Sequence, residues 1–146
     1  MLAINPYLSF SGNCEKAFDF YKSVFGGELS MSKYKDAPPD SCCAKAQTPE
    51  KIMHARLSFG PTVLMGGDCS KDCGCTEAGG GHVAINICPG SADEAKKIFT
   101  ALEKGGQVVK PLEKTFWADS FGIVTDQFGV RWIINYCKDK KHSCGK

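Results

Sequence analysis

Two groups of closely spaced cysteines carry the most distinctive chemistry in this sequence. Cys69, Cys73 and Cys75 lie in a Gly-rich stretch, and Cys42 and Cys43 are adjacent in a second polar stretch. Clustered thiolates bind soft metal ions such as Cu(I), zinc, cadmium or trivalent arsenic. Their spacing differs from the paired C-x2-C ligands of structural zinc sites, so zinc is not specifically indicated. The alternative is that they are reduced loop cysteines that bind nothing.

The total cysteine content bears on the cellular compartment. Nine cysteines in 146 residues is a density also found in secreted, disulfide-bonded domains. However, the count is odd, and the first ten residues, MLAINPYLSF, lack the basic and apolar segments of an export signal. We therefore expect reduced thiols in a cytoplasmic protein. Cys14, Cys88 and Cys137 fall in or beside expected helices and strands, where cysteine usually serves as a small core residue.

Two histidines, His54 and His82, lie in expected strands where a ligand could reach them. An imidazole can act near neutral pH as an acid, a base or a hydrogen-bonding group for a ligand. The alternative is a strand histidine that is satisfied by a backbone carbonyl or by water. Arg56, on the same strand as His54, could pair with an anionic substrate, although a surface ion pair is the more common role.

Four aromatic residues form a cluster in the second half of the chain: Phe116, Trp117, Phe121 and Trp132. Such rings can form the wall of a pocket for a flat or apolar ligand, but packing in the core is their more common role. Asp126 precedes a Gly-containing turn, so we expect it to stabilise the turn rather than to catalyse a reaction.

The elements that must position these residues occur twice in the same order. Alternating and apolar runs predict strands at 6–11, 29–34, 52–59 and 62–65 in the first half. Similar runs predict strands at 82–88, 121–125 and 130–136 in the second half, and one that begins at 108–111. Each half therefore reads as one strand, one helix and three strands.

The two predicted helices share their signals. Asn13 and Ser91 are suited to cap the N-termini, and a Gly-Gly pair ends each helix. A shift of 78 residues aligns Ala17 with Ala95 and Tyr21 with Phe99. This similarity indicates a duplicated βαβββ unit, and the alternative is that any two amphipathic helices look this much alike. A βαβββ unit has its helix on one face of the sheet, so two units side by side would enclose a trough for a ligand.

The overall charge and hydropathy exclude two classes of partner. With 18 basic and 16 acidic residues the net charge is +2, too small to attract nucleic acid or anionic lipid strongly. No apolar run approaches the roughly 18–20 residues of a membrane-spanning helix.

Three segments carry a family resemblance: PYLSFSGNCEKAFDFYKSVFGGEL, IMHARLSFGPTVLMGGD and FWADSFGIVTDQFGVRWIIN. They resemble the PhnB-like branch of the vicinal oxygen chelate superfamily, which also contains glyoxalase I and bleomycin-resistance proteins. The resemblance implies an α+β fold, in which two tandem βαβββ modules form a curved mixed sheet around a trough, and usually a homodimer. We expect one domain over 1–146, with modules at about 1–68 and 82–137, a Cys/Gly-rich connecting loop and a basic tail at 138–146.

The resemblance also locates the metal-ligand positions, one in each of four strands in metal-dependent members. They fall on Asn5, on Leu64 or Met65, on His82 and on Ile133. Only His82 is a good ligand for a divalent ion, and a single imidazole does not hold a catalytic metal. We therefore expect no glyoxalase-type metal site. No glycine-rich loop follows the first strand, which disfavours the methyltransferase-like name that some members carry.

Three functional hypotheses follow. The first is a small-molecule-binding homodimer with no cofactor, whose candidate ligand-binding residues are Tyr7, His54, His82, Trp117 and Phe121. The second is binding of, or resistance to, thiophilic metals or metalloids through Cys42, Cys43, Cys69, Cys73 and Cys75. The third is a metal-dependent lyase, isomerase or dioxygenase with a degenerate site. The sequence identifies no catalytic residue and no substrate.

Overall fold

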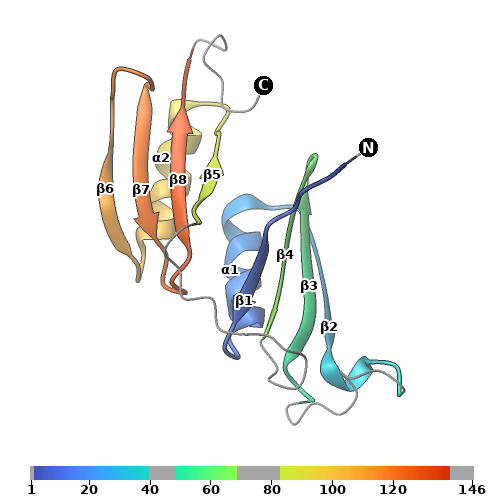
Figure 1. Cartoon of the computed structure of the whole chain (residues 1–146). Coiled ribbons are helices and arrows are strands. Elements are labelled where there is room, and N and C mark those ends of the chain that lie inside the picture. Colours follow the sequence, from blue (N-terminus) through green and yellow to red (C-terminus); the bar gives the residue numbers. More distant parts are fainter. Residues whose placement is uncertain (1, 40–48, 69–82, 139–146) are drawn as a thin grey trace. The chain divides into compact units, whose positions relative to one another are not determined.

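The chain forms two compact units, Met1–Gly79 and Gly80–Lys146, and the computed structural model describes residues 2–39, 49–68 and 83–138 (Figure 1). The first unit contains β1 (Tyr7–Phe10), α1 (Cys14–Phe25), β2 (Glu28–Lys33), a short 3-10 helix (Tyr34–Asp36), β3 (Ile52–Phe59) and β4 (Thr62–Asp68). The second contains β5 (Ile85–Ile87), α2 (Ala92–Glu103), β6 (Gln107–Glu113), β7 (Ser120–Thr125) and β8 (Arg131–Tyr136). The predicted elements are confirmed, with ends that differ by a few residues.

The two units have the same topology. Each has a four-stranded sheet, in the order β1-β4-β3-β2 in the first unit and β5-β8-β7-β6 in the second. The first strand of each unit is parallel to its last, and the other neighbours are antiparallel. One helix covers one face of each sheet (Figure 1). The predicted α+β fold of two tandem βαβββ modules is therefore confirmed.

The apolar stripes of both helices form the module cores. The buried residues are Cys14, Ala17, Phe18 and Tyr21 in α1 and Ala95, Ile98, Phe99 and Leu102 in α2. The predicted shift of 78 residues aligns the ends of the helices, but the two buried sets differ by 81. The difference is three residues, nearly one helical turn, so both alignments place an apolar stripe on about the same face.

The two helices begin differently. The Ser91 hydroxyl accepts a hydrogen bond from the Glu94 N–H at 3.1 Å, which confirms the predicted cap of α2. Asn13 makes no such bond, so its predicted capping role is wrong. The Asp68 carboxylate takes that role instead, because the parallel pairing of β1 with β4 places Asp68 beside Phe10.

Each sheet also has a face that its own helix does not cover. Successive strand residues point to opposite faces, and Ala55, Leu57 and Leu64 are buried on the side of α1. The opposite side, which we call the first helix-free face, is defined by Tyr7, Ser9, Glu28, Ser30, Ser32, His54, Arg56, Ser58, Val63, Met65 and Gly67. In the described part of the chain, no helix is long and apolar enough to cross a bilayer.

Candidate functional site

The first helix-free face is organised by the strand register. Tyr7 on β1 pairs with Met65 on β4. Arg56 on β3 pairs with Met65 on one side and with Ser30 on β2 on the other. These residues form one row across the sheet. In the adjoining row, Ser9 pairs with Gly67 and Ser32 pairs with His54. Two predicted ligand-binding residues, Tyr7 and His54, therefore lie on the same face.

The rings of Tyr7 and His54 stack on each other, with centroids 6.0 Å apart and planes inclined by 29°. They come from strands that flank β4, so the contact spans that strand. Gly67 provides the space, because a Cβ atom there would lie 2.8 Å from the Tyr7 hydroxyl and 2.7 Å from the Met53 carbonyl oxygen. Sequence reasoning missed Gly67, since the predicted strand ended at Met65.

Arg56 supplies positive charge beside this ring pair. Its side chain is exposed, and it forms no ion pair or hydrogen bond with any residue in 2–39, 49–68 or 83–138. A surface ion pair, the more common role of such an arginine, is therefore not found in that part of the chain. Its cross-strand neighbours are Met65 and Ser30, neither of which carries charge.

Two other predicted residues, Trp117 and Phe121, meet in the second unit. Their rings pack edge to face at 5.2 Å, and Phe116 packs on Trp117 at 4.6 Å. Trp117 is 41% exposed and Phe116 is 97% exposed, so neither is a core residue. A cavity of about 180 Å³ lies here, lined by residues 114–119 and Cys137. Trp132, in contrast, is 2% exposed and packs in the core.

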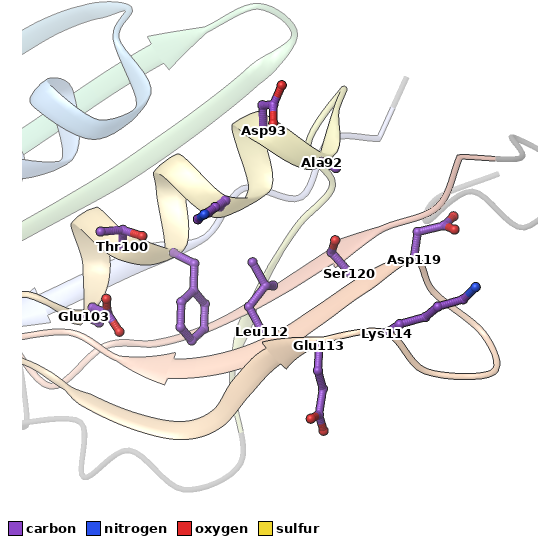
Figure 2. Close-up of a pocket in the computed structure, with 11 residues that line it drawn as sticks. Ala92, Asp93, Thr100, Glu103, Leu112, Glu113, Lys114, Asp119 and Ser120 are labelled. Carbon is purple, nitrogen blue, oxygen red and sulfur yellow. The ribbon is translucent and has the colours of Figure 1, made fainter.

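A larger cavity, of about 590 Å³, lies between α2 and the strands β6 and β7 (Figure 2). Its volume is within the usual range for small-molecule sites. In Figure 2 the Leu112 side chain points toward α2, whereas Glu113 points to the other side of the strand. The charged residues that line it are the acidic Asp93, Glu103, Glu113 and Asp119 and the basic Lys96 and Lys114. The acidic residues outnumber the basic ones, and the sequence had suggested none of these residues as part of a site.

The metal-ligand positions inferred from the resemblance differ in exposure and in the face of the sheet on which they lie. Asn5 is exposed before β1, Leu64 is buried on the α1 side, and Met65 lies on the first helix-free face. Ile133, between the buried Trp132 and Ile134, lies on the face of its sheet away from α2. Within the described residues, no three His, Cys, Asp or Glu side chains are grouped to hold a metal ion.

Several predicted site residues lie outside the described residues. These are His82 and the loop cysteines Cys42, Cys43, Cys69, Cys73 and Cys75.

The two buried carboxylates have structural roles. Asp126 accepts hydrogen bonds from the Phe128 and Val130 N–H groups at 2.8 and 3.0 Å, which confirms its predicted turn role. The other Asp126 oxygen accepts a hydrogen bond from Nε1 of Trp132 at 2.8 Å. Asp68, which sequence reasoning did not single out, accepts three backbone N–H groups.

The three cysteines expected in the core have different environments. Cys14 is fully buried, and burial, together with the negative charges of Asp68 and Glu15, raises the pKa of its thiol to about 12. This environment makes the thiol unreactive at neutral pH. The core prediction is wrong for Cys88, which is exposed because it follows the short edge strand β5. Cys137 is intermediate, and its thiol donates a hydrogen bond to the Trp117 carbonyl oxygen at 3.1 Å.

Similar proteins are found in both sequence and structure comparisons. Protein YjdN of Escherichia coli is 31% identical over 147 residues, covering 95% of this chain and 98% of that protein. The crystal structure of PA1353 from Pseudomonas aeruginosa is 41% identical, with a TM-score of 0.84, and covers 95% of this chain and 100% of that one. The PhnB protein from Bacillus cereus, 21% identical over 93% of this chain and 100% of its own, shares the fold with a TM-score of 0.70.

A family model matches residues 3–134, nearly the whole of both modules. The two βαβββ modules agree with this match. The chain therefore belongs to the Glyoxalase/Bleomycin resistance protein/Dioxygenase superfamily.

Proposed function

We propose that this protein binds a small organic molecule at the helix-free faces of its modules and has no complete glyoxalase-type metal site. The observation that carries the proposal is the stacked pair of Tyr7 and His54 over Gly67. Tyr7 is 50% exposed, so a ring surface that could contact a ligand is accessible within the first unit. A glycine below two rings leaves space that a side chain would fill, as is expected where a sheet positions aromatic groups for binding.

The rigidity of the sheet supports the same proposal. Both rings stand on paired strands, and the backbone on either side of β4 is held by ladder hydrogen bonds. Sites on regular elements hold their side chains more precisely than sites on loops. Trp117 and Phe121 provide a second candidate ligand-binding group, and His82 is proposed as a further one.

A ligand screen tests this proposal. The full chain is screened against a diverse small-molecule library by thermal shift, and hits are located by chemical-shift changes in labelled protein. We expect hits that shift the His54 signals and that lose affinity in Tyr7→Ala and His54→Ala. Phe20→Ala serves as the control, since it removes an aromatic ring from α1. A screen without hits at either helix-free face would contradict the proposal.

We also propose that the protein is a cytoplasmic homodimer. Large apolar side chains support an interface, since Leu2, Ile4 and Phe116 are 87%, 88% and 97% exposed. The odd number of cysteines supports a reducing compartment. Light scattering coupled to size-exclusion chromatography should give a mass about twice the 15.8 kDa of the chain. A mass of one chain across the micromolar range would contradict dimerisation.

Metal analysis separates this proposal from the two alternatives. We expect no stoichiometric metal in protein purified under reducing conditions without chelators. A soft metal that is lost when thiols are blocked would favour binding through the loop cysteines. A hard divalent ion that is lost in His82→Ala would favour a degenerate enzyme site.

A further inference from the structure

Arg56 has no ion-pair partner among the described residues of the first helix-free face. Arg56 lies in a central position, with partners on both sides in the sheet, and His54 lies two residues away on the same strand. The acidic side chain nearest in register is Glu28, which pairs with Ser58 and is a diagonal neighbour of Arg56 on the same face. No ion pair joins Glu28 to Arg56 in the described part of the chain. Within 2–39, 49–68 and 83–138 the guanidinium group therefore has no ionic partner, and an added anion can pair with it.

Serine residues neighbour Arg56 in the strand register of this face. Ser30 is its direct cross-strand neighbour, and Ser32 is one position further along the same face of β2. The Ser58 hydroxyl oxygen, on the same face of β3, is shielded from solvent and has no hydrogen-bond partner among the described residues. A buried hydroxyl without a partner costs free energy unless something binds it. An arginine guanidinium binds a carboxylate through paired, charge-assisted hydrogen bonds, and a neighbouring serine hydroxyl can donate a further one.

The ring pair defines the other end of the ligand. The stacked arrangement of Tyr7 and His54 presents flat π-surfaces, which favour a flat aromatic partner over a bulky aliphatic one. Residues two apart on a strand are separated by about 7 Å, so Arg56 lies about one aromatic ring away from His54. Met65, between Tyr7 and Arg56 in the row, supplies an adaptable apolar contact.

We infer that the ligand of this face is a planar aromatic anion of the aromatic carboxylate type. Its ring would contact Tyr7 and His54, and its carboxylate would accept hydrogen bonds from the Arg56 guanidinium. This inference rests on the proposed small-molecule binding and adds the chemical class of the ligand.

Isothermal titration of the full chain tests the inference with three matched probes. The probes are 2-naphthoate, its neutral amide 2-naphthamide, and decahydronaphthalene-2-carboxylate, a non-planar anion with the same carbon skeleton. We expect 2-naphthoate to bind at least tenfold more tightly than either of the others, since it alone satisfies both the arginine and the rings. Arg56→Gln should weaken 2-naphthoate about tenfold, equivalent to about 1.4 kcal/mol, without weakening 2-naphthamide.

Three further variants test the roles of charge and of the Tyr7 ring. Lys16→Gln removes the same unit of charge from the exposed side of α1 and should leave the affinity for 2-naphthoate unchanged. Tyr7→Phe keeps the ring and should retain most of the affinity, whereas Tyr7→Ala should lose it. Circular dichroism confirms that each variant is folded before titration.

The outcomes separate the inference from the proposed function. Equal affinities for 2-naphthoate and 2-naphthamide, or an Arg56→Gln variant that binds 2-naphthoate like wild type, would overturn the aromatic-anion class. Library hits of another class at this face would leave small-molecule binding intact. No binding by the three probes together with no library hit at either helix-free face would overturn both.

Discussion

The carboxylate of Asp68, the last residue of β4, accepts a hydrogen bond from the backbone N–H of Cys14, the first residue of α1, at 3.0 Å. The same oxygen accepts the Gly12 N–H at 2.8 Å, and the other accepts the Ile52 N–H at 2.9 Å. One buried carboxylate therefore accepts hydrogen bonds from backbone N–H groups at the start of α1 and at the start of β3. Because a helix leaves its first N–H groups without internal partners, this contact stabilises the packing of α1 on the sheet.

Asp68→Asn tests this role. The amide nitrogen of asparagine cannot accept a hydrogen bond, so at least one buried N–H loses its partner. We expect the free energy of unfolding in urea to fall by about 1–3 kcal/mol. Asp19→Asn, at an exposed position of α1, should change it by less than about 0.5 kcal/mol. Equal stabilities of Asp68→Asn and wild type would contradict the capping role.

The raised pKa of the Cys14 thiol predicts that the free energy of unfolding depends on pH. Its pKa is raised from the ordinary value of 9.0 to about 12 by burial and by the nearby charges of Asp68 and Glu15. Below pH 9 the thiol is protonated in both the folded and the unfolded chain. Between pH 9 and 12 the unfolded chain releases this proton and the folded chain keeps it, so stability falls as the pH rises.

The measurement is the difference in unfolding free energy between wild type and Cys14→Ala at several pH values. Taking the difference removes the contribution of other titrating groups. We expect wild type to lose stability relative to Cys14→Ala from pH 9 upward. A difference that stays constant to pH 11 would show that the thiol ionises equally in both states.

Gly67→Ala should disturb the ring pair and the strand beneath it. A Cβ atom would lie 2.7 Å from the Met53 carbonyl oxygen, a backbone atom that cannot move aside easily. We expect a loss of about 1–3 kcal/mol in unfolding free energy and a displaced Tyr7 ring, visible as changed His54 chemical shifts. Gly90→Ala is the control, because its Cβ would approach only the flexible end of Glu94, at 3.4 Å. Similar stabilities for the two variants would refute the close contact.

The two tryptophans should report different environments. Trp132 is 2% exposed and Trp117 is 41% exposed. In Trp117→Phe the remaining tryptophan is the buried Trp132, so its fluorescence emission should be blue-shifted and weakly quenched by acrylamide. In Trp132→Phe the remaining tryptophan is the exposed Trp117, so its emission should be red-shifted and readily quenched. Trp132→Phe should also lose about 1–3 kcal/mol, because it removes the hydrogen bond to the buried Asp126. Indistinguishable quenching of the two variants would contradict this assignment.

The sequence by itself predicted the elements and their order, because these depend on local patterns. Alternation located β3 at its observed bounds, Ile52–Phe59, and the apolar period located both helices. The Gly-Gly pairs marked where the helices end, and Gly26 and Gly105 adopt positive φ angles of 73° and 72° there. The motifs also indicated the superfamily and the paired modules.

Only the tertiary structure decided which distant residues meet. The strand order β1-β4-β3-β2 places β4 between β1 and β3, so Tyr7 and His54 can stack across Gly67 although they are far apart in the chain. The same parallel pairing of β1 and β4 gives the helix cap to Asp68 rather than to the adjacent Asn13. Strand pairing and side-chain burial depend on the whole sheet, because they join segments that are far apart in the chain. The spacing of apolar residues and the preference of a residue for a helix cap are properties of a short segment.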